Sequence, residues 1–204
     1  IFAAFLVAMA AFILYESGPR ALGPGCAGAA PGGDSMQGNR NIEIKARVAD
    51  LAAVEKRAGA IADSGPVDIA QDDTFFACPR GRLKLRELAP GQGQLIHYHR
   101  PDQGGPKLSD YVIAPTSDPA ALREALTRAY GVAGRVRKHR RLYLAGRTRI
   151  HLDRVEGLGD FMELEVVLGA GDDTGGGEAE ARRIMQALGV AEADLVEGAY
   201  VDLM

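Results

Sequence analysis

The sequence predicts an α+β fold, an eight-stranded antiparallel β-barrel with helices packed on its outside. Charged and apolar residues alternate at every second position in six stretches, which is the spacing of strands whose successive side chains point to opposite faces. Short hairpin links dominate between the expected strands, so the sheet is mostly antiparallel. Three stretches with helical spacing lie in the connections. Strands that are charged on one face and apolar on the other can close into a barrel without exposed edges.

The predicted domain opens with a strand and a helix. Residues 41–49 alternate in the strand pattern, with Glu43 and Lys45 on one face. Asp50 is expected to cap a helix over 51–64, because an aspartate side chain accepts hydrogen bonds from the unpaired N–H groups of a first helical turn. Apolar residues recur on one face of this helix, which predicts that it packs on the sheet.

Seven more strands and two more helices follow. Turns rich in proline and glycine separate the strands. A helix is expected over 118–130, capped by Ser117 or Asp118. A final helix is expected over 177–188, after a Gly-rich loop at 169–177. The remaining strands are expected at 67–78, 81–88, 94–100, 108–114, 134–144, 147–155 and 160–168.

The polar faces of the expected strands hold Arg, Lys and a few carboxylates, with little Ser, Thr, Asn or Gln. An ordinary sheet that turns this face to water is the alternative. Six strands share the pattern, and Glu43, Asp153, Glu163 and Glu165 stand among the cations. This recurrence favours a barrel with charges lining its inside and helices covering its apolar outside. Such an interior has the chemistry needed to hold a polyphosphate and a divalent metal bound to it.

Length, charge and cysteine usage narrow the class of protein. The 204 residues suit one domain with a core of ordinary size. The formal net charge of −3 provides no overall field that would attract nucleic acid. Cys26 and Cys78 form no spaced motif, which argues against a zinc site or a disulfide scaffold and is consistent with a cytoplasmic protein.

The N-terminal region differs from the rest of the chain. Residues 1–15 are continuously apolar, which is shorter than the roughly 20 residues that span a bilayer. A run rich in proline and glycine follows. We expect a domain at 36–204 and treat residues 1–35 as an apolar segment plus linker. That segment is either an upstream extension outside the mature protein, a shortened membrane anchor or a signal peptide.

Five motifs in order resemble the CYTH family, which is named for class IV adenylyl cyclases and mammalian thiamine triphosphatase. The family is grouped as the triphosphate tunnel metalloenzymes. Each motif alone is weak, and their order along residues 38–204 carries the resemblance. The motifs are NIEIKARV at 41–48, GRLKLRE at 81–87, IHYHRPD at 96–102, VRKHRRLYL at 136–144 and RIHLDRVEGLGDFMELE at 149–165.

The resemblance implies a triphosphate tunnel in which basic residues grip the substrate and carboxylates hold one or two Mg²⁺ or Mn²⁺ ions. The implied metal ligands are Glu43, Glu163 and Glu165, with Asp153 as a further candidate. The implied phosphate contacts are Lys45, Arg82, Lys84, Arg86, Arg100, Lys138, Arg140 and Arg149. Lys45, Arg140 and Asp153 are the expected catalytic residues.

Two positions bear on the number of metal ions and on proton transfer in the implied site. Asn41 stands where the family has the first glutamate of its N-terminal signature. Its neutral oxygen is a weaker ligand for a hard cation, so occupancy by one metal or two stays open. His151 shares the face of Arg149 and Asp153, and we expect a structural histidine there, with proton transfer as the alternative.

The family contains two activities, and the sequence leaves both open. Hydrolysis of an organic or inorganic triphosphate is favoured, because it demands less of the site. Conversion of ATP to cyclic AMP and pyrophosphate is the alternative, and a polyphosphate-binding protein without catalysis is a second. The expected partner is a small-molecule triphosphate, such as ATP, thiamine triphosphate or inorganic triphosphate. We expect no nucleic acid, no membrane contact by the domain, and a monomer or homodimer.

Overall fold

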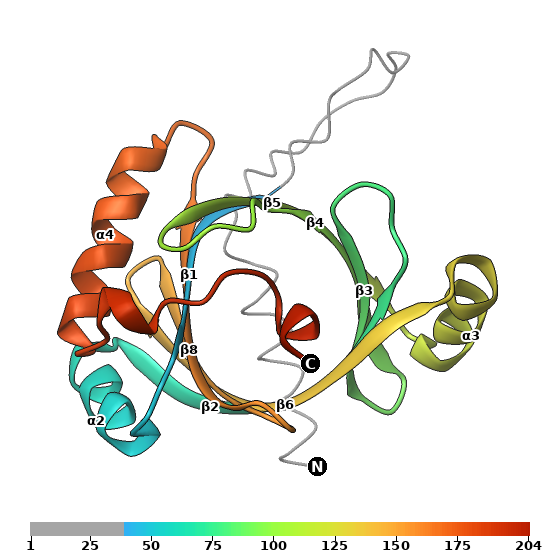
Figure 1. The fold of residues 1–204 in the computed structure, drawn as a ribbon, viewed down its shortest axis with the longest axis horizontal. Helices are drawn as coiled ribbons and strands as arrows, with labels where there is room; N and C mark the ends of the chain where they lie inside the picture. Colours follow the sequence, from blue (N-terminus) through green and yellow to red (C-terminus); the bar gives the residue numbers. More distant parts are fainter. Residues whose placement is uncertain (1–38) are drawn as a thin grey trace, which may run out of the picture.

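Eight antiparallel strands form one closed barrel in the computed structural model, which describes residues 39–204 (Figure 1). The strands are β1 (Asn39–Arg47), β2 (Ser64–Phe76), β3 (Arg82–Ala89), β4 (Gln92–His99), β5 (Lys107–Thr116), β6 (Val132–Ala145), β7 (Thr148–Val155) and β8 (Gly159–Leu168). Around the barrel they follow the order β1, β5, β4, β3, β2, β6, β7, β8, and β8 pairs with β1. The predicted α+β barrel is therefore confirmed. The prediction for residues 1–35 concerns residues outside the described range.

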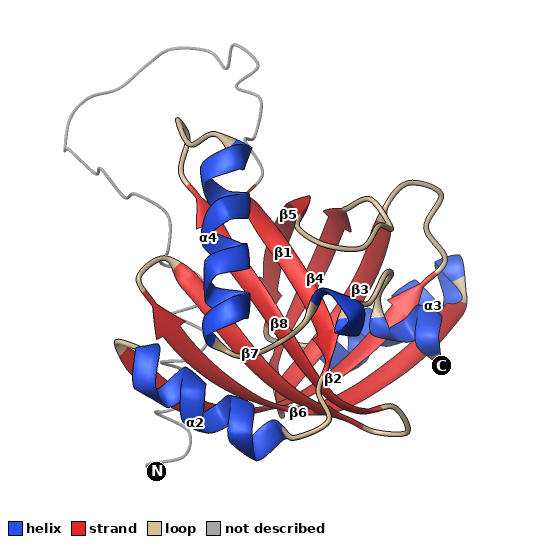
Figure 2. Ribbon diagram, turned by 60° about the vertical axis from the view of Figure 1, so that its left-hand side comes forward, coloured by secondary structure: helices blue, strands red, loops and turns tan. Residues whose placement is uncertain are grey.

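The largest apolar cluster lies outside the barrel wall. Ile44, Ile150 and Leu164 are completely buried in a cluster to which the helices α2 (Leu51–Ile61) and α4 (Thr174–Ala187) contribute. Figure 2 shows α4 lying along β1 and β8, with α2 below it. Because successive strand side chains point to opposite faces, burying these apolar residues under helices directs their charged neighbours into the barrel.

A third helix, α3 (Pro119–Tyr130), packs against β2, β3 and β4 on the other side of the barrel (Figure 1). Asp118 is its N-cap, and Asp118 Oδ1 accepts a hydrogen bond from the backbone N–H of Ala121 at 3.0 Å. Gly131 ends the helix with φ of 74°, a left-handed conformation that glycine adopts without a steric penalty. The cap predicted for this helix is confirmed at Asp118.

Replacing Asp118 by alanine should lower the free energy of unfolding by about 1 kcal/mol, because the first turn of α3 loses its capping acceptor. Asp118→Asn keeps an oxygen at the same place and is the matched control, with an expected change of only a few tenths of a kcal/mol. Urea unfolding of both variants measures the difference. Equal losses in the two variants would show that the charge, and not the cap, carries the effect.

The first helix is shorter than predicted. The expected range was 51–64, and the helix ends at Ile61. The backbone N–H of Asp63 donates to the carbonyl of Leu144 at 2.7 Å, and β2 begins at Ser64. Pairing with the long strand β6 therefore draws the last residues of the predicted helix into the sheet. The helical spacing of the sequence does not reveal this tertiary contact.

The last helix begins earlier than predicted. The run at 169–177 is rich in glycine and was expected to be a loop, yet α4 starts at Thr174. Asp173 caps it, because Asp173 Oδ1 accepts a hydrogen bond from the backbone N–H of Gly176 at 2.9 Å. With these boundaries, no helix within residues 39–204 is long and apolar enough to cross a membrane.

The chain after α4 returns to the barrel. The backbone N–H of Val196 donates to the carbonyl of Lys45 at 2.9 Å, and Leu195 forms a β-bridge with Ala46. The chain then ends in a short 3₁₀ helix, η2 (Tyr200–Leu203). Figure 1 shows this last segment inside the ring of strands, so it belongs to the surroundings of the barrel interior.

Candidate active site in the barrel interior

Charged side chains of six strands line one cavity inside the barrel, together with Arg100 just after β4. The predicted site residues that line it are Glu43, Lys45, Lys84, Arg86, Arg100, Lys138, Arg140, Arg149, Glu163 and Glu165. Two predicted residues lie just beyond it. Arg82 pairs with Asp102 and Asp202 at 2.8 Å each. Asp153 is completely buried and accepts from Lys138 and Arg140. Residues far apart in the sequence thus converge where the resemblance implies a substrate.

Asp73 of β2 anchors two of the cavity's cations. It accepts hydrogen bonds at 2.8 Å from Arg86 Nε and Nη2 and from Lys84 Nζ. Burial alone would raise the pKa of Asp73, but Arg86 and Lys84 hold it far below its ordinary value. Sequence reasoning did not single out Asp73, because its position opposite Arg86 appears only once β2 is paired with β3.

Asp73→Asn should change how stability depends on pH. The folded-state pKa of Asp73 lies below its unfolded value, so this carboxylate adds stability above about pH 4 that is lost as the pH falls further. Below about pH 4 the difference in free energy of unfolding between the wild-type protein and Asp73→Asn should therefore shrink by up to about 1.4 kcal/mol per pH unit. Urea unfolding of both proteins between pH 7 and pH 3 measures the gap. A gap that stays constant with pH would contradict the assigned ion pairs.

A second carboxylate, Asp153 of β7, anchors the cations of β6. Asp153 Oδ2 accepts from Lys138 Nζ at 2.8 Å and from Arg140 Nη2 at 2.6 Å, and Asp153 Oδ1 accepts from Arg140 Nε at 2.7 Å. Burial alone would raise the pKa of Asp153, but Arg140 and Lys138 hold it below its usual range. The Asp153 carboxylate is thus surrounded by cationic donors and fixes where they point.

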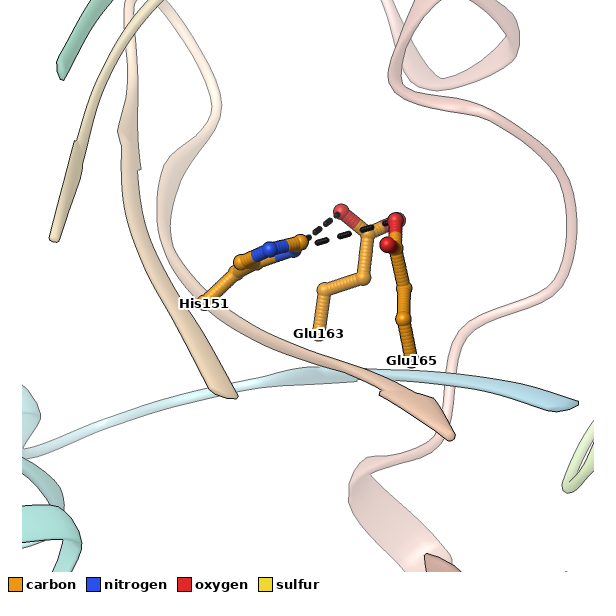
Figure 3. Close-up of side chains that lie close together, drawn as sticks. All are labelled: His151, Glu163 and Glu165. Carbon is orange, nitrogen blue, oxygen red and sulfur yellow. Dashed lines mark ion pairs between the residues drawn. The ribbon is translucent and has the colours of Figure 1, made fainter. Parts of the chain in front are cut away.

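A histidine and two glutamates bring their ligand atoms together on the neighbouring strands β7 and β8 (Figure 3). His151 faces Glu163 directly across the two strands, and Glu165 follows two residues along on the same face. His151 Nδ1 lies 3.7 Å from Glu163 Oε2 and 3.8 Å from Glu165 Oε1. All three ligand atoms lie within 4.8 Å of one another. The strand register therefore builds a compact N,O,O donor set.

The protonation states of this cluster suit a metal ion. Burial lowers the pKa of His151, which keeps the imidazole neutral at pH 7. Burial would raise the pKa of Glu163, but Lys45 and Arg140 hold it well below its usual range. Neutral imidazole and ionised carboxylate are the forms in which these groups bind metals. The set fits a divalent cation.

Glu43, the third implied ligand, lies beside the cluster. It pairs with Glu165 in the register of β1 and β8. Glu43 Oε1 accepts a hydrogen bond from Arg100, and it lies 3.8 Å from Lys45 Nζ. In this structure Glu43 is therefore an ion-pair partner of two predicted phosphate contacts, while His151 stands in the donor set together with Glu163 and Glu165.

Residues 39–200 match the CYTH domain family. The chain belongs to the CYTH domain family. The match spans the barrel from its first strand to the start of the last 3₁₀ helix. A search of curated proteins finds no match for the sequence.

Solved structures share the fold of this CYTH domain at low sequence identity. The PH1012 protein of Pyrococcus horikoshii is 24% identical with a TM-score of 0.70, over 80% of this chain and 99% of the other. A protein of Vibrio parahaemolyticus proposed to be an adenylate cyclase is 21% identical with a TM-score of 0.64, over 82% and 98%. A proposed adenylyl cyclase from Hippeastrum with a dominant triphosphatase activity is 16% identical with a TM-score of 0.54, over 74% and 88%.

The C-terminal segment of this CYTH domain occupies one end of the cavity. Tyr200 donates its hydroxyl hydrogen to Asp153 Oδ2 at 2.9 Å, and its ring centroid lies 4.4 Å from Lys45 Nζ. The carbonyl of Gly198 accepts from Lys45 Nζ at 3.3 Å and from Arg100 Nη2 at 2.8 Å. Sequence reasoning missed this contribution, because a glycine before a one-turn 3₁₀ helix and the tyrosine that starts it give no periodic signal. The segment helps to set the position of Lys45 and Arg100.

Proposed function

We propose that this CYTH domain binds a triphosphate inside its barrel and hydrolyses it with Mg²⁺ or Mn²⁺ as cofactor. The observation that carries the proposal is the convergence of inward-facing lysines and arginines beside the cluster of His151, Glu163 and Glu165. Arginine forks and lysine ammonium groups are the usual protein ligands of phosphate oxygens. A neighbouring divalent cation is the usual partner of a triphosphate.

The cations are held in place before any substrate arrives. Asp73 fixes Lys84 and Arg86, and Asp153 fixes Lys138 and Arg140. Positive groups that are already oriented need little rearrangement as charge develops on a phosphoryl group, which is the main source of catalysis in phosphoryl transfer. We assign Asp153 as a positioning residue for the cations of β6.

Lys45 and Arg140 connect the phosphate-binding cations with the metal cluster. Glu163 lies between them, 2.5 Å from Arg140 Nη2 and 3.5 Å from Lys45 Nζ. A divalent cation held by His151, Glu163 and Glu165 would supply neutralisation of charge on phosphate oxygens. We assign Lys45 and Arg140 to stabilise the negative charge that grows on the phosphoryl oxygens while water attacks phosphorus and the bridging P–O bond breaks.

The same binding of a triphosphate by these cations also suits the cyclase reaction. Attack of water on the terminal phosphorus gives hydrolysis, whereas attack of a ribose 3′-hydroxyl on the α-phosphorus gives cyclic AMP and pyrophosphate. The names of the Vibrio and Hippeastrum proteins include both activities. We favour hydrolysis, because it requires no site for adenine. A binder without catalysis would keep the cations and have no use for the paired carboxylates Glu163 and Glu165.

The test is product identification with the purified full chain. ATP, thiamine triphosphate and inorganic triphosphate are incubated with Mg²⁺ or Mn²⁺, with and without excess chelator, and products are followed by phosphorus NMR. Hydrolysis predicts release of inorganic phosphate and the corresponding diphosphate, which stops when the metal is chelated. Cyclic AMP with pyrophosphate would establish the cyclase instead. Tight binding without turnover of any triphosphate would establish the non-catalytic binder.

A further inference from the structure

The imidazole of His151 is buried without a hydrogen-bond partner. Its side chain is 1% exposed, and neither ring nitrogen makes a hydrogen bond to any of residues 39–204. Buried polar groups in folded proteins nearly always have a partner. A histidine that merely filled space in the barrel wall would be expected to donate its N–H to a carbonyl or a carboxylate. The unpaired ring therefore indicates a ligand that completes this part of the site.

The groups around the ring identify the kind of ligand. Across β7 and β8 it faces Glu163 and Glu165, at 3.7 Å and 3.8 Å from their nearest oxygens. These separations are longer than a hydrogen bond, which is about 2.7–3.2 Å. They agree with two donors on one ion, since atoms each about 2.1 Å from a metal lie about 3–4 Å apart. Figure 3 shows the imidazole ring pointing toward both carboxylates, with dashed lines for the two ion pairs.

The other neighbours of the ring are not competing partners. On β6 the residue paired with His151 is Leu142, which is apolar and buried. Arg140 is engaged by Asp153 and Glu163, and Arg149 donates to Glu165 at 3.1 Å. The donors Arg140 and Arg149 thus already have acceptors, and His151 Nδ1, which faces Glu163 and Glu165, is left to bind a cation.

We propose that His151 is a metal ligand together with Glu163 and Glu165, and that it makes the site prefer Mn²⁺ to Mg²⁺. Mg²⁺ is a hard ion that takes oxygen ligands and keeps several waters, whereas imidazole is a good ligand for first-row transition ions. A nitrogen ligand in the donor set therefore lowers the affinity of the site for Mg²⁺ more than its affinity for Mn²⁺. This inference rests on the proposed function only for the location of the metal, and it specifies which ion the site selects.

The test measures metal binding to the full chain without substrate. Calorimetry gives the dissociation constants of Mn²⁺ and Mg²⁺, and electron-spin-echo spectroscopy of bound Mn²⁺ detects a directly coordinated ¹⁴N nucleus. The wild-type protein should bind Mn²⁺ at least about 10-fold more tightly than Mg²⁺ and show nitrogen coupling. His151→Phe should weaken Mn²⁺ binding about 10- to 100-fold and remove the coupling. His151→Asp, with an all-oxygen donor set, should shift the preference toward Mg²⁺.

The matched control is His139→Phe, since His139 is exposed on the outer face of β6, and both affinities should stay unchanged. Bound Mn²⁺ without nitrogen coupling in the wild-type protein would overturn the inference, and that measurement needs no variant to fold. Nitrogen coupling in a protein that turns over no triphosphate would leave this inference standing and refute the proposed function. Triphosphate turnover with Mn²⁺ in a protein that shows no nitrogen coupling would refute this inference and leave the proposed function standing.

Discussion

Glu163→Gln is expected to lower the rate of triphosphate turnover by about 10³-fold. Glu163 links the cations to the metal cluster, because it accepts from Arg140, lies 3.5 Å from Lys45 and belongs to the cluster with His151. The amide keeps the shape and removes the charge. Losing one charge-stabilising group in a site shielded from water costs about 10²–10³-fold, and weaker metal binding adds to that loss.

Steady-state kinetics at saturating metal measures this effect, and thermal unfolding checks that the variant is folded. Glu156→Gln is the matched control, since Glu156 lies in the exposed turn between β7 and β8, and its turnover should equal that of the wild-type protein. A folded Glu163→Gln variant with turnover within about 3-fold of wild type would exclude Glu163 from the metal site and from the reaction.

Arg140→Ala is expected to lower kcat/KM by about 10²–10³-fold. The guanidinium of Arg140 lines the cavity and bridges Asp153 and Glu163. Its removal takes away a planar donor that fits phosphate oxygens. It also leaves two buried carboxylates with one partner fewer, so unfolding has to be measured in parallel. Arg140→Lys retains the charge without the fork and should recover part of the loss.

Arg137→Ala is the matched control for Arg140→Ala on the same strand. Arg137 lies on the outer face of β6 and pairs with Asp72 at the surface, so its removal should leave kcat/KM unchanged. Equal losses from Arg137→Ala and Arg140→Ala would mean that both act through the stability of β6. Unchanged activity in a folded Arg140→Ala variant would place the substrate away from the inner face of the barrel.

The fold was predictable because the signal that specifies it is local and repeated. In β3 the side chains of Arg82, Lys84 and Arg86 all lie on the inner face, and Leu85 is completely buried on the other. A period of two over several strands leaves few architectures that bury the apolar face and protect the edges. Helix ends were less predictable, since pairing of Asp63 with Leu144 overrode the helical pattern.

The candidate site was predictable where it consists of alternating charges on strands. Site residues whose role depends on pairing between distant strands or segments could not be predicted from the sequence. Asp73 becomes the partner of Arg86 only through the register of β2 and β3. Tyr200, at the start of the short 3₁₀ helix η2, reaches Asp153 across 47 residues of sequence. His151 was expected to be structural, and its lack of a partner among residues 39–204 is a property of its surroundings.

The proposed function requires that a triphosphate binds inside the barrel, on the cations that Asp73 and Asp153 anchor. The most direct measurement is a crystal structure of the protein with inorganic triphosphate and Mn²⁺, in which anomalous scattering locates the metal. We expect phosphate oxygens within hydrogen-bonding distance of Arg86 and Arg140, and a manganese peak beside Glu163 and Glu165. A triphosphate bound on the outer surface, or a manganese peak remote from these glutamates, would contradict the proposed function.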